Sequence, residues 1–126
     1  MIPQDLTDDL KELGYVFEVL EEANKVYVRF ENFAIPSDKF SMSATQLLIF
    51  TTPLYPKTNF DMFWTDENLV LKNGNVPKNA EVIETHLGKR WRRFSYHPYN
   101  NKPWNPALDD VGSFIEHVRE RLRRGD

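Results

Sequence analysis

Ser95 and His97 are residues whose types and spacing could supply a nucleophile and its base, with Asp109 and Asp110 further along the chain. Serine-nucleophile catalysis needs a hydroxyl beside an imidazole that a carboxylate orients. Residues two apart on a strand share one face, so this spacing also arises without any catalytic role. No glycine-framed turn surrounds Ser95 to expose it as a nucleophile. We therefore retain Ser95 and His97 only as catalytic candidates.

Metal and cofactor chemistry find little support in the sequence. The three histidines, His86, His97 and His117, are widely separated and do not form a metal-ligand pattern such as HExxH. No glycine-rich phosphate loop occurs among the 5 glycines. We predict no metal site and no cofactor.

The chain contains no cysteine. Disulfides, zinc–thiolate sites, thiol redox chemistry and a thioester carried by this chain are therefore excluded.

A basic and aromatic segment, Lys89 to Phe94, is the other candidate for function. Residues 1–88 carry 7 Lys and Arg against 14 Asp and Glu, whereas residues 89–126 carry 9 against 5. The guanidinium groups could bind phosphates, and Trp91 could stack on a base. However, a half-buried strand has the same alternation of basic and aromatic residues, and the whole chain has a net charge of −3. We favour a protein partner over nucleic acid. The candidate partner-binding residues, which we expect to be exposed, are Arg90, Arg92, Arg93, Tyr96, His97 and Tyr99, with Lys89 beside them.

Length and composition limit the scaffold that can position these residues. The 126 residues suit one domain, residues 1–126, and the 40% of apolar residues supports a packed core. The longest apolar runs, such as Leu47 to Phe50, are far shorter than a membrane span, and the first residues do not resemble a signal peptide. We expect a soluble, cytoplasmic protein.

The first half of the chain predicts a helix followed by a strand meander. Leu6, Leu10 and Leu13 share one helical face, and Gly14 follows as a left-handed cap. Alternating apolar residues from Tyr15 to Val19 and from Val26 to Phe30 predict an antiparallel hairpin. Gln46 to Phe50 predicts a third strand.

The second half predicts weaker strands and one clear helix. We expect strands at 60–64, at 69–71 and at 91–96, with a surface loop over 75–88 and irregular chain over 97–106. The final helix is expected to begin with Asn105 as its N-cap, to present Leu108, Val111 and Leu122 on its apolar face, and to end in a loose tail at 123–126. The fold class is therefore α+β, with helices packed on an antiparallel meander of about four strands.

The segment from Leu48 to Trp64, LIFTTPLYPKTNFDMFW, resembles the strand, Tyr-Pro turn and following strand of the ubiquitin-conjugating-enzyme (UBC-like) fold, in its prokaryotic family E branch. Further features agree in order: Leu69 to Gly74, the segment Gly88 to His97, and Trp104-Asn105-Pro106, which resembles the Trp-x-Pro that follows the active site of conjugating enzymes. The resemblance covers nearly the whole chain. It implies a UBC-like domain with an irregular active-site region between the sheet and the last helix.

The chain departs from the family pattern at the active site. The family's catalytic cysteine lies about eight or nine residues before that Trp, where this chain has Phe94-Ser95-Tyr96. His97-Pro98 resembles the start of the family's His-Pro-Asn element, but Tyr99 stands in place of Asn, and the pair follows the nucleophile position. An imidazole at position 97 could orient a partner's C-terminus or bond to the loop backbone.

Two classes of function follow from this resemblance. The preferred one is a non-catalytic module that binds a ubiquitin-like protein, its activating enzyme, or both, in a bacterial conjugation pathway. The alternative is a transferase that carries the ubiquitin-like C-terminus as an oxyester on Ser95, or a conjugating enzyme whose native cysteine has been replaced by this serine. A serine hydroxyl without an activating base is a much poorer nucleophile than a thiolate, which favours the module.

Overall fold

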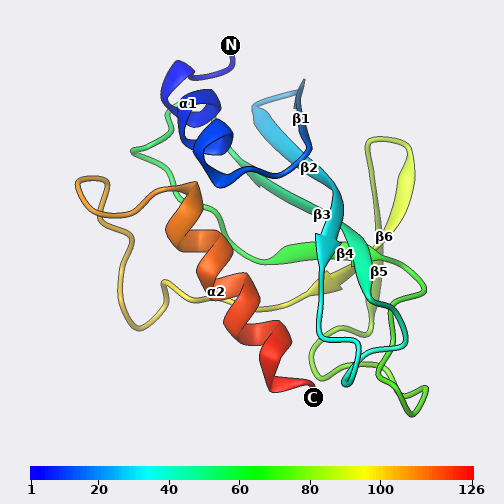
Figure 1. The fold of residues 1–126 in the computed structure, drawn as a ribbon. Coiled ribbons are helices and arrows are strands. Elements are labelled where there is room, and N and C mark those ends of the chain that lie inside the picture. The colour runs from blue at the N-terminus through cyan, green and yellow to red at the C-terminus, as the bar shows by residue number, and fades with distance from the viewer.

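The computed structural model describes residues 1–126 as two helices and six strands in a single antiparallel sheet (Figure 1). The elements are α1 (Gln4–Leu13), β1 (Phe17–Glu22), β2 (Lys25–Ala34), β3 (Ala44–Thr51), β4 (Phe63–Asp66), β5 (Val82–His86), β6 (Lys89–Phe94) and α2 (Val111–Arg124). Their order across the sheet is β1-β2-β3-β4-β6-β5. The predicted α+β class, with helices on an antiparallel sheet, is confirmed.

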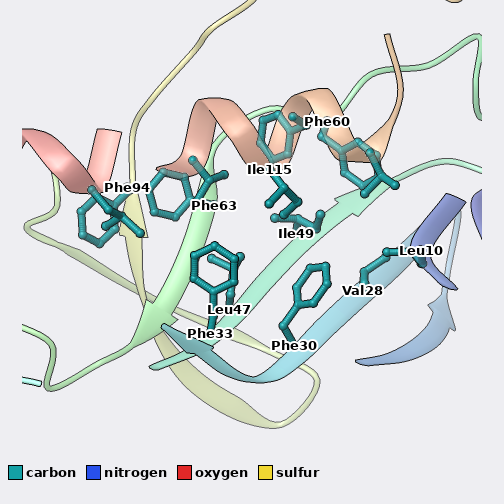
Figure 2. Packing of buried hydrophobic residues seen from close by; sticks show 14 of the residues in the cluster. Leu10, Val28, Phe30, Phe33, Leu47, Ile49, Phe60, Phe63, Phe94 and Ile115 are labelled. Atoms are coloured by element: carbon teal, nitrogen blue, oxygen red, sulfur yellow. The ribbon is translucent and has the colours of Figure 1, made fainter. Parts of the chain in front are cut away.

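Both helices lie on the same face of the sheet and enclose the main core (Figure 2). Leu6 and Leu10 of α1 and Phe114 and Val118 of α2 are fully buried against apolar residues of β2, β3 and β4. A smaller cluster lies on the opposite face and consists of Tyr27, Leu48, Trp64 and Trp91. The central strands therefore bury side chains on both faces, which explains the continuous apolar run at Leu47 to Phe50.

The structure confirms the helix, the hairpin and the third strand predicted for the first half of the chain. The first helix spans Gln4–Leu13, and Gly14 caps it in the left-handed region at φ 79°. The hairpin is β1 and β2, paired from Phe17 opposite Phe30 to Glu22 opposite Lys25. The third strand is the longer β3.

The strand count is wrong, because the predicted four-stranded meander is a six-stranded sheet. Residues 82–86 form the edge strand β5 inside the predicted surface loop. Its side chains do not alternate between apolar and polar, since Glu84 and His86 form polar bonds instead of facing a core. The strands expected near 60–64 and 91–96 are β4 and β6, at shifted bounds, and Leu71 makes only a single bridge to Phe40.

The predicted start of the last helix is also wrong. Asn105 caps a separate turn by accepting a hydrogen bond from Ala107 N (2.9 Å), and Leu108 is 80% exposed. The true N-cap is Asp110, whose side chain accepts from Ser113 N (2.9 Å) while Ser113 Oγ accepts from Asp110 N (2.9 Å). The tail is not loose, because the Asp126 carbonyl oxygen accepts from Lys78 N (3.2 Å) and from the Arg121 guanidinium (2.9 Å).

Candidate functional site

Ser95 lies directly after β6, where the chain leaves the sheet. Its backbone N donates to Asn79 O (3.0 Å), and its Oγ accepts a hydrogen bond from Arg93 Nε (3.2 Å). A guanidinium can stabilise negative charge on this oxygen, but it cannot accept the proton that a serine must lose to become a nucleophile. The structure gives Ser95 Oγ no hydrogen bond to His97, so the two catalytic candidates do not form a serine–histidine pair.

His97 is instead paired with Asp61, a residue that the sequence analysis did not select. His97 Nδ1 lies 2.8 Å from Asp61 Oδ2, and the two side chains are 39% and 43% exposed. This bond holds the imidazole by Nδ1 and leaves Nε2 open to solvent or to a partner. The sequence signal that could have found Asp61 is a single acidic residue within the aromatic run Phe60 to Trp64.

The backbone around Asp61 is fixed by the neighbouring segment. Met62 adopts φ 61°, in the left-handed region that non-glycine residues rarely occupy. Its N donates to Tyr96 O (3.0 Å), so the segment before β4 is tied to the segment after β6. Unusual backbone of this kind persists only where surrounding contacts determine it, and it is common at functional sites.

A hollow of about 350 Å³ opens beside this pair. Its lining residues are Phe50, Thr51, Thr52, Thr58, Asn59, Asp61 and Met62. The Thr58 hydroxyl bonds to the hydroxyls of Thr51 (3.0 Å) and Thr52 (2.8 Å), which gives the hollow a polar wall. Its hydroxyl and carboxylate groups can hydrogen-bond an extended backbone near His97.

Strand β6 separates the predicted basic cluster into two faces. Trp91 belongs to the small cluster on the open face of the sheet, and Arg93, two residues on, bonds to Glu84 Oε2 (2.8 Å) beside it. Phe94 belongs to the main core under α2. Side chains along β6 alternate between the two faces of the sheet, so the arginines cannot meet one flat partner together.

The expectation that Arg92 is exposed is wrong. The residue is 8% exposed, and its guanidinium donates to Ala80 O (2.7 Å) and Glu67 O (2.8 Å). It therefore holds the chain before β5 and the end of β4 onto the sheet. Its side chain is committed to these backbone contacts.

The other partner-binding candidates lie at two ends of β6. Arg90 is exposed and pairs with Glu67 (2.9 Å) near the β5–β6 turn. His97 is exposed three residues beyond the opposite end of β6. Tyr96 packs edge-on against Phe63, and Tyr99 is half-buried against Trp104, their ring centroids 5.1 Å apart. Of the six candidates, only Arg93, Tyr96 and His97 adjoin Ser95.

Glu84 organises the open face of the sheet, another role that the sequence analysis missed. It accepts from Trp64 Nε1 (2.9 Å), from Arg93 and from His86 Nε2 (3.0 Å), while the other imidazole nitrogen of His86 lies 3.1 Å from Tyr27 Oη. Burial would raise the pKa of Glu84, but the hydrogen bonds that its neighbours donate outweigh this and lower it. The carboxylate thus stays charged and fixes Arg93 beside Ser95.

The Tyr-Pro turn and Trp104 close the other side of the site. Tyr55 is 4% exposed and Trp64 is 1% exposed. Trp104 is half-buried, and its Nε1 donates to Pro56 O (2.8 Å). The irregular chain between β6 and α2 is therefore held against the turn.

The histidines do not assemble a metal site. His86 contacts Tyr27 and Glu84, His97 contacts Asp61, and His117 packs against Tyr99. No group of three or more His, Asp or Glu side chains comes together in a ligating arrangement. Neither helix is long and apolar enough to cross a membrane.

Comparison with known families identifies the class of protein. Residues 2–125 match the family model of prokaryotic E2 family E, and the chain belongs to this family. The family is related to ubiquitin-conjugating enzymes, which supports a role in a conjugation pathway and, in general terms, an interaction with a ubiquitin-like protein and its activating enzyme. No curated protein and no solved structure matches the chain.

Proposed function

We propose that this protein is a non-catalytic conjugating-enzyme-like module, which binds a ubiquitin-like protein, its activating enzyme, or both, in a bacterial conjugation pathway. The observation that carries the proposal is the state of the nucleophile position. The chain has no thiol, and Ser95 Oγ is bonded to Arg93 while His97 is bonded to Asp61. A hydroxyl without a proton acceptor reacts too slowly to replace a thiolate.

The binding surface that we propose for the ubiquitin-like C-terminus is formed by His97, Asp61 and the adjoining hollow. A C-terminal tail is an extended chain that ends in a carboxylate. The hollow offers hydroxyl groups to its backbone, and the Arg93 guanidinium offers donors to its carboxylate. Because His97 Nδ1 donates to Asp61, the free Nε2 of the neutral imidazole can accept a backbone N–H of the tail. Membership of the E2 family supports the identity of the partners.

Intact-mass analysis tests the absence of catalysis. The protein is incubated with ATP and with the activating enzyme and ubiquitin-like protein of the source organism. We expect no covalent adduct on this chain. An adduct that forms with this protein and is lost in Ser95→Ala establishes the oxyester transferase instead and overturns the module.

Calorimetric titration against the ubiquitin-like protein tests the binding surface. We expect His97→Ala to weaken binding tenfold or more, which is about 1.4 kcal/mol. Arg90→Ala, at the opposite end of β6, is the matched control and should leave the affinity unchanged. The reverse result moves the surface to the β5–β6 turn, and unchanged affinity in both variants shows that neither end of β6 binds this partner.

A further inference from the structure

A second groove lies between the end of β2 and the last turns of α2, and it shares no residue with the hollow beside His97. Its volume is about 210 Å³. Phe33, Ile35 and Leu122 form an apolar floor and are 0%, 7% and 1% exposed. Phe33 points from β2 toward the face of the sheet that α2 covers (Figure 2). The floor of the groove is therefore formed by side chains that are packed in the core.

One wall of the groove is an unpaired strand edge. The pairing of β1 with β2 begins at Phe17 opposite Phe30, and the last bond across this edge runs from Glu31 N to Val16 O (3.3 Å). On the other side of β2, Ile35 N donates to Ser43 O (3.0 Å). Since hydrogen-bonded and non-hydrogen-bonded pairs alternate in antiparallel strands, the N–H and C=O of Ala34 point away from β3. Ala34 therefore presents a free donor and acceptor beside the groove.

The opposite wall carries two arginines, of which only Arg119 has a carboxylate of the chain within 4.0 Å. The Arg119 guanidinium lies over the rings of Phe33 (5.3 Å) and Tyr15 (5.5 Å), and its nearest carboxylate, that of Glu116, is 3.8 Å away. Arg123, one turn later, is exposed and has no ion pair within 4.0 Å. The carboxylate of Asp126 pairs with Arg121 and Arg124 instead.

A third cation stands at the same end of the groove. Lys39 follows Pro36, which lines the groove, and its N donates to Pro36 O (3.2 Å). Its side chain lies against Gly125, two residues beyond Arg123. Lys39 is exposed, and no carboxylate lies within ion-pair distance of its ammonium.

We propose that this groove binds an extended acidic segment of a partner protein, which adds to the edge of β2 as a further strand. The segment's backbone would pair with the free N–H and C=O of Ala34. Its acidic side chains, at alternate positions, would point to the α2 face, where their methylene groups cover the apolar floor and their carboxylates meet Arg119 and Arg123. The intervening side chains would point to the opposite face of the sheet. This interaction is independent of the site at Ser95 and His97.

A peptide suits these walls better than another anion. Nucleic acid could neutralise the arginines but could not form the paired N–H and C=O bonds of a strand. A lipid headgroup likewise leaves the strand edge unpaired. A strand edge beside two arginines favours a peptide that carries an acidic side chain at every second position.

Fluorescence anisotropy with the whole protein tests the proposal. The probe is a labelled seven-residue peptide, capped at both ends, in which glutamate alternates with valine. We expect saturable binding, and we expect at least tenfold weaker binding of the same peptide with lysine in place of glutamate. Arg123→Glu should also weaken binding tenfold or more, whereas Lys102→Glu, an exposed charge reversal in the loop before α2, should not.

Strand addition is tested separately from charge. Ala34→Pro removes the outward N–H at an edge position where proline is tolerated, and an N-methylated probe removes the matching donors from the peptide. Each change should reduce binding at least tenfold while the circular dichroism of the protein is unchanged.

Four results would overturn the proposal. They are equal binding of the glutamate and lysine peptides, equal binding of the glutamate peptide to Arg123→Glu, tighter binding of an eight-nucleotide oligothymidylate, and no saturation up to about 1 mM. If Ala34→Pro does not fold, the N-methylated probe alone decides whether strand pairing occurs.

Discussion

Tyr55 shows how one hydroxyl connects three parts of the chain. Its Oη donates to Asp9 Oδ2 of α1 (2.8 Å) and accepts from Val111 N, the first residue of α2 (2.9 Å). The bond to Val111 N satisfies one of the N–H groups that the start of every helix leaves free. The Tyr-Pro turn beside the candidate site is thereby fixed to both helices.

Removal of this hydroxyl should destabilise the protein without changing its shape. Tyr55→Phe keeps the ring but leaves the buried Val111 N–H without a partner, so we expect the free energy of unfolding to fall by about 1–3 kcal/mol. Urea denaturation followed by tryptophan fluorescence measures the change. Tyr96→Phe is the control, because the Tyr96 side chain is only half-buried. An equal loss in the two variants would contradict the bridging role.

The same residue predicts how stability depends on alkaline pH. Burial, and then the hydrogen bond to Asp9, raises the pKa of Tyr55 above its ordinary value of 10.0, and burial raises the pKa of Tyr99 to about 12. The folded protein therefore retains protons that the unfolded chain releases. The stabilising contribution is complete below about pH 10 and is lost progressively above it. Denaturation between about pH 9 and pH 11 should show this decline, and Tyr55→Phe should make it less steep.

At the scale of elements, the boundary of α2 is set by a capping box and not by the Asn-Pro pair before it. Asp110 and Ser113 satisfy each other's backbone N–H groups, and Gly125 ends the helix at φ 64°. The turn at 105–108 remains separate because Asp110 has an extended backbone, with φ −149° and ψ −174°. The irregular chain from Ser95 to Asp110 is thus free to cover the Tyr-Pro turn.

Two substitutions distinguish these possible helix starts. Asp110→Ala should lower the free energy of unfolding by about 1 kcal/mol, since it removes the cap. Asn105→Ala, in the exposed turn, should change it by no more than about 0.5 kcal/mol. Thermal unfolding of both variants by circular dichroism provides the comparison. A larger loss in Asn105→Ala would place the functional cap where the sequence pattern first suggested it.

At the scale of the whole molecule, the sheet has a protected centre and two edges. β3 lies between β2 and β4, under both helices and with a second apolar cluster behind it. β1 and β5 are the outer strands (Figure 1). Three of the five residues of β5 are half-buried and two are exposed, so little apolar surface holds this edge.

Hydrogen exchange should therefore differ across the sheet. We expect the amides of β3 to exchange only through global unfolding, and those of β5 to exchange faster through local opening, because few buried contacts are lost when an edge strand detaches. Mass spectrometry of peptides from residues 44–51 and 82–86 measures both rates. Equal protection of the two strands would show that the Glu84 network makes β5 part of the central unit.

The sequence by itself determined the features that depend on local spacing. Leu6, Leu10 and Gly14 define α1 because a helix brings residues three and four apart onto one face, and the alternation before and after residues 21–25 defines the first hairpin. The absence of cysteine excluded a thioester at the nucleophile position, Phe94-Ser95-Tyr96. The ordered motifs were also sufficient to identify the family.

Only the tertiary structure decided the contacts between distant segments. β5 has no apolar alternation because its polar side chains bond across the sheet, and nothing local marks Glu84 as the acceptor from Trp64 and Arg93. The burial of Arg92 depends on carbonyl groups 12 and 25 residues away, and the pair of Asp61 and His97 spans 36 residues. A hydrogen bond between side chains depends on where the backbone brings them, and residue types and spacing along one strand do not contain that information.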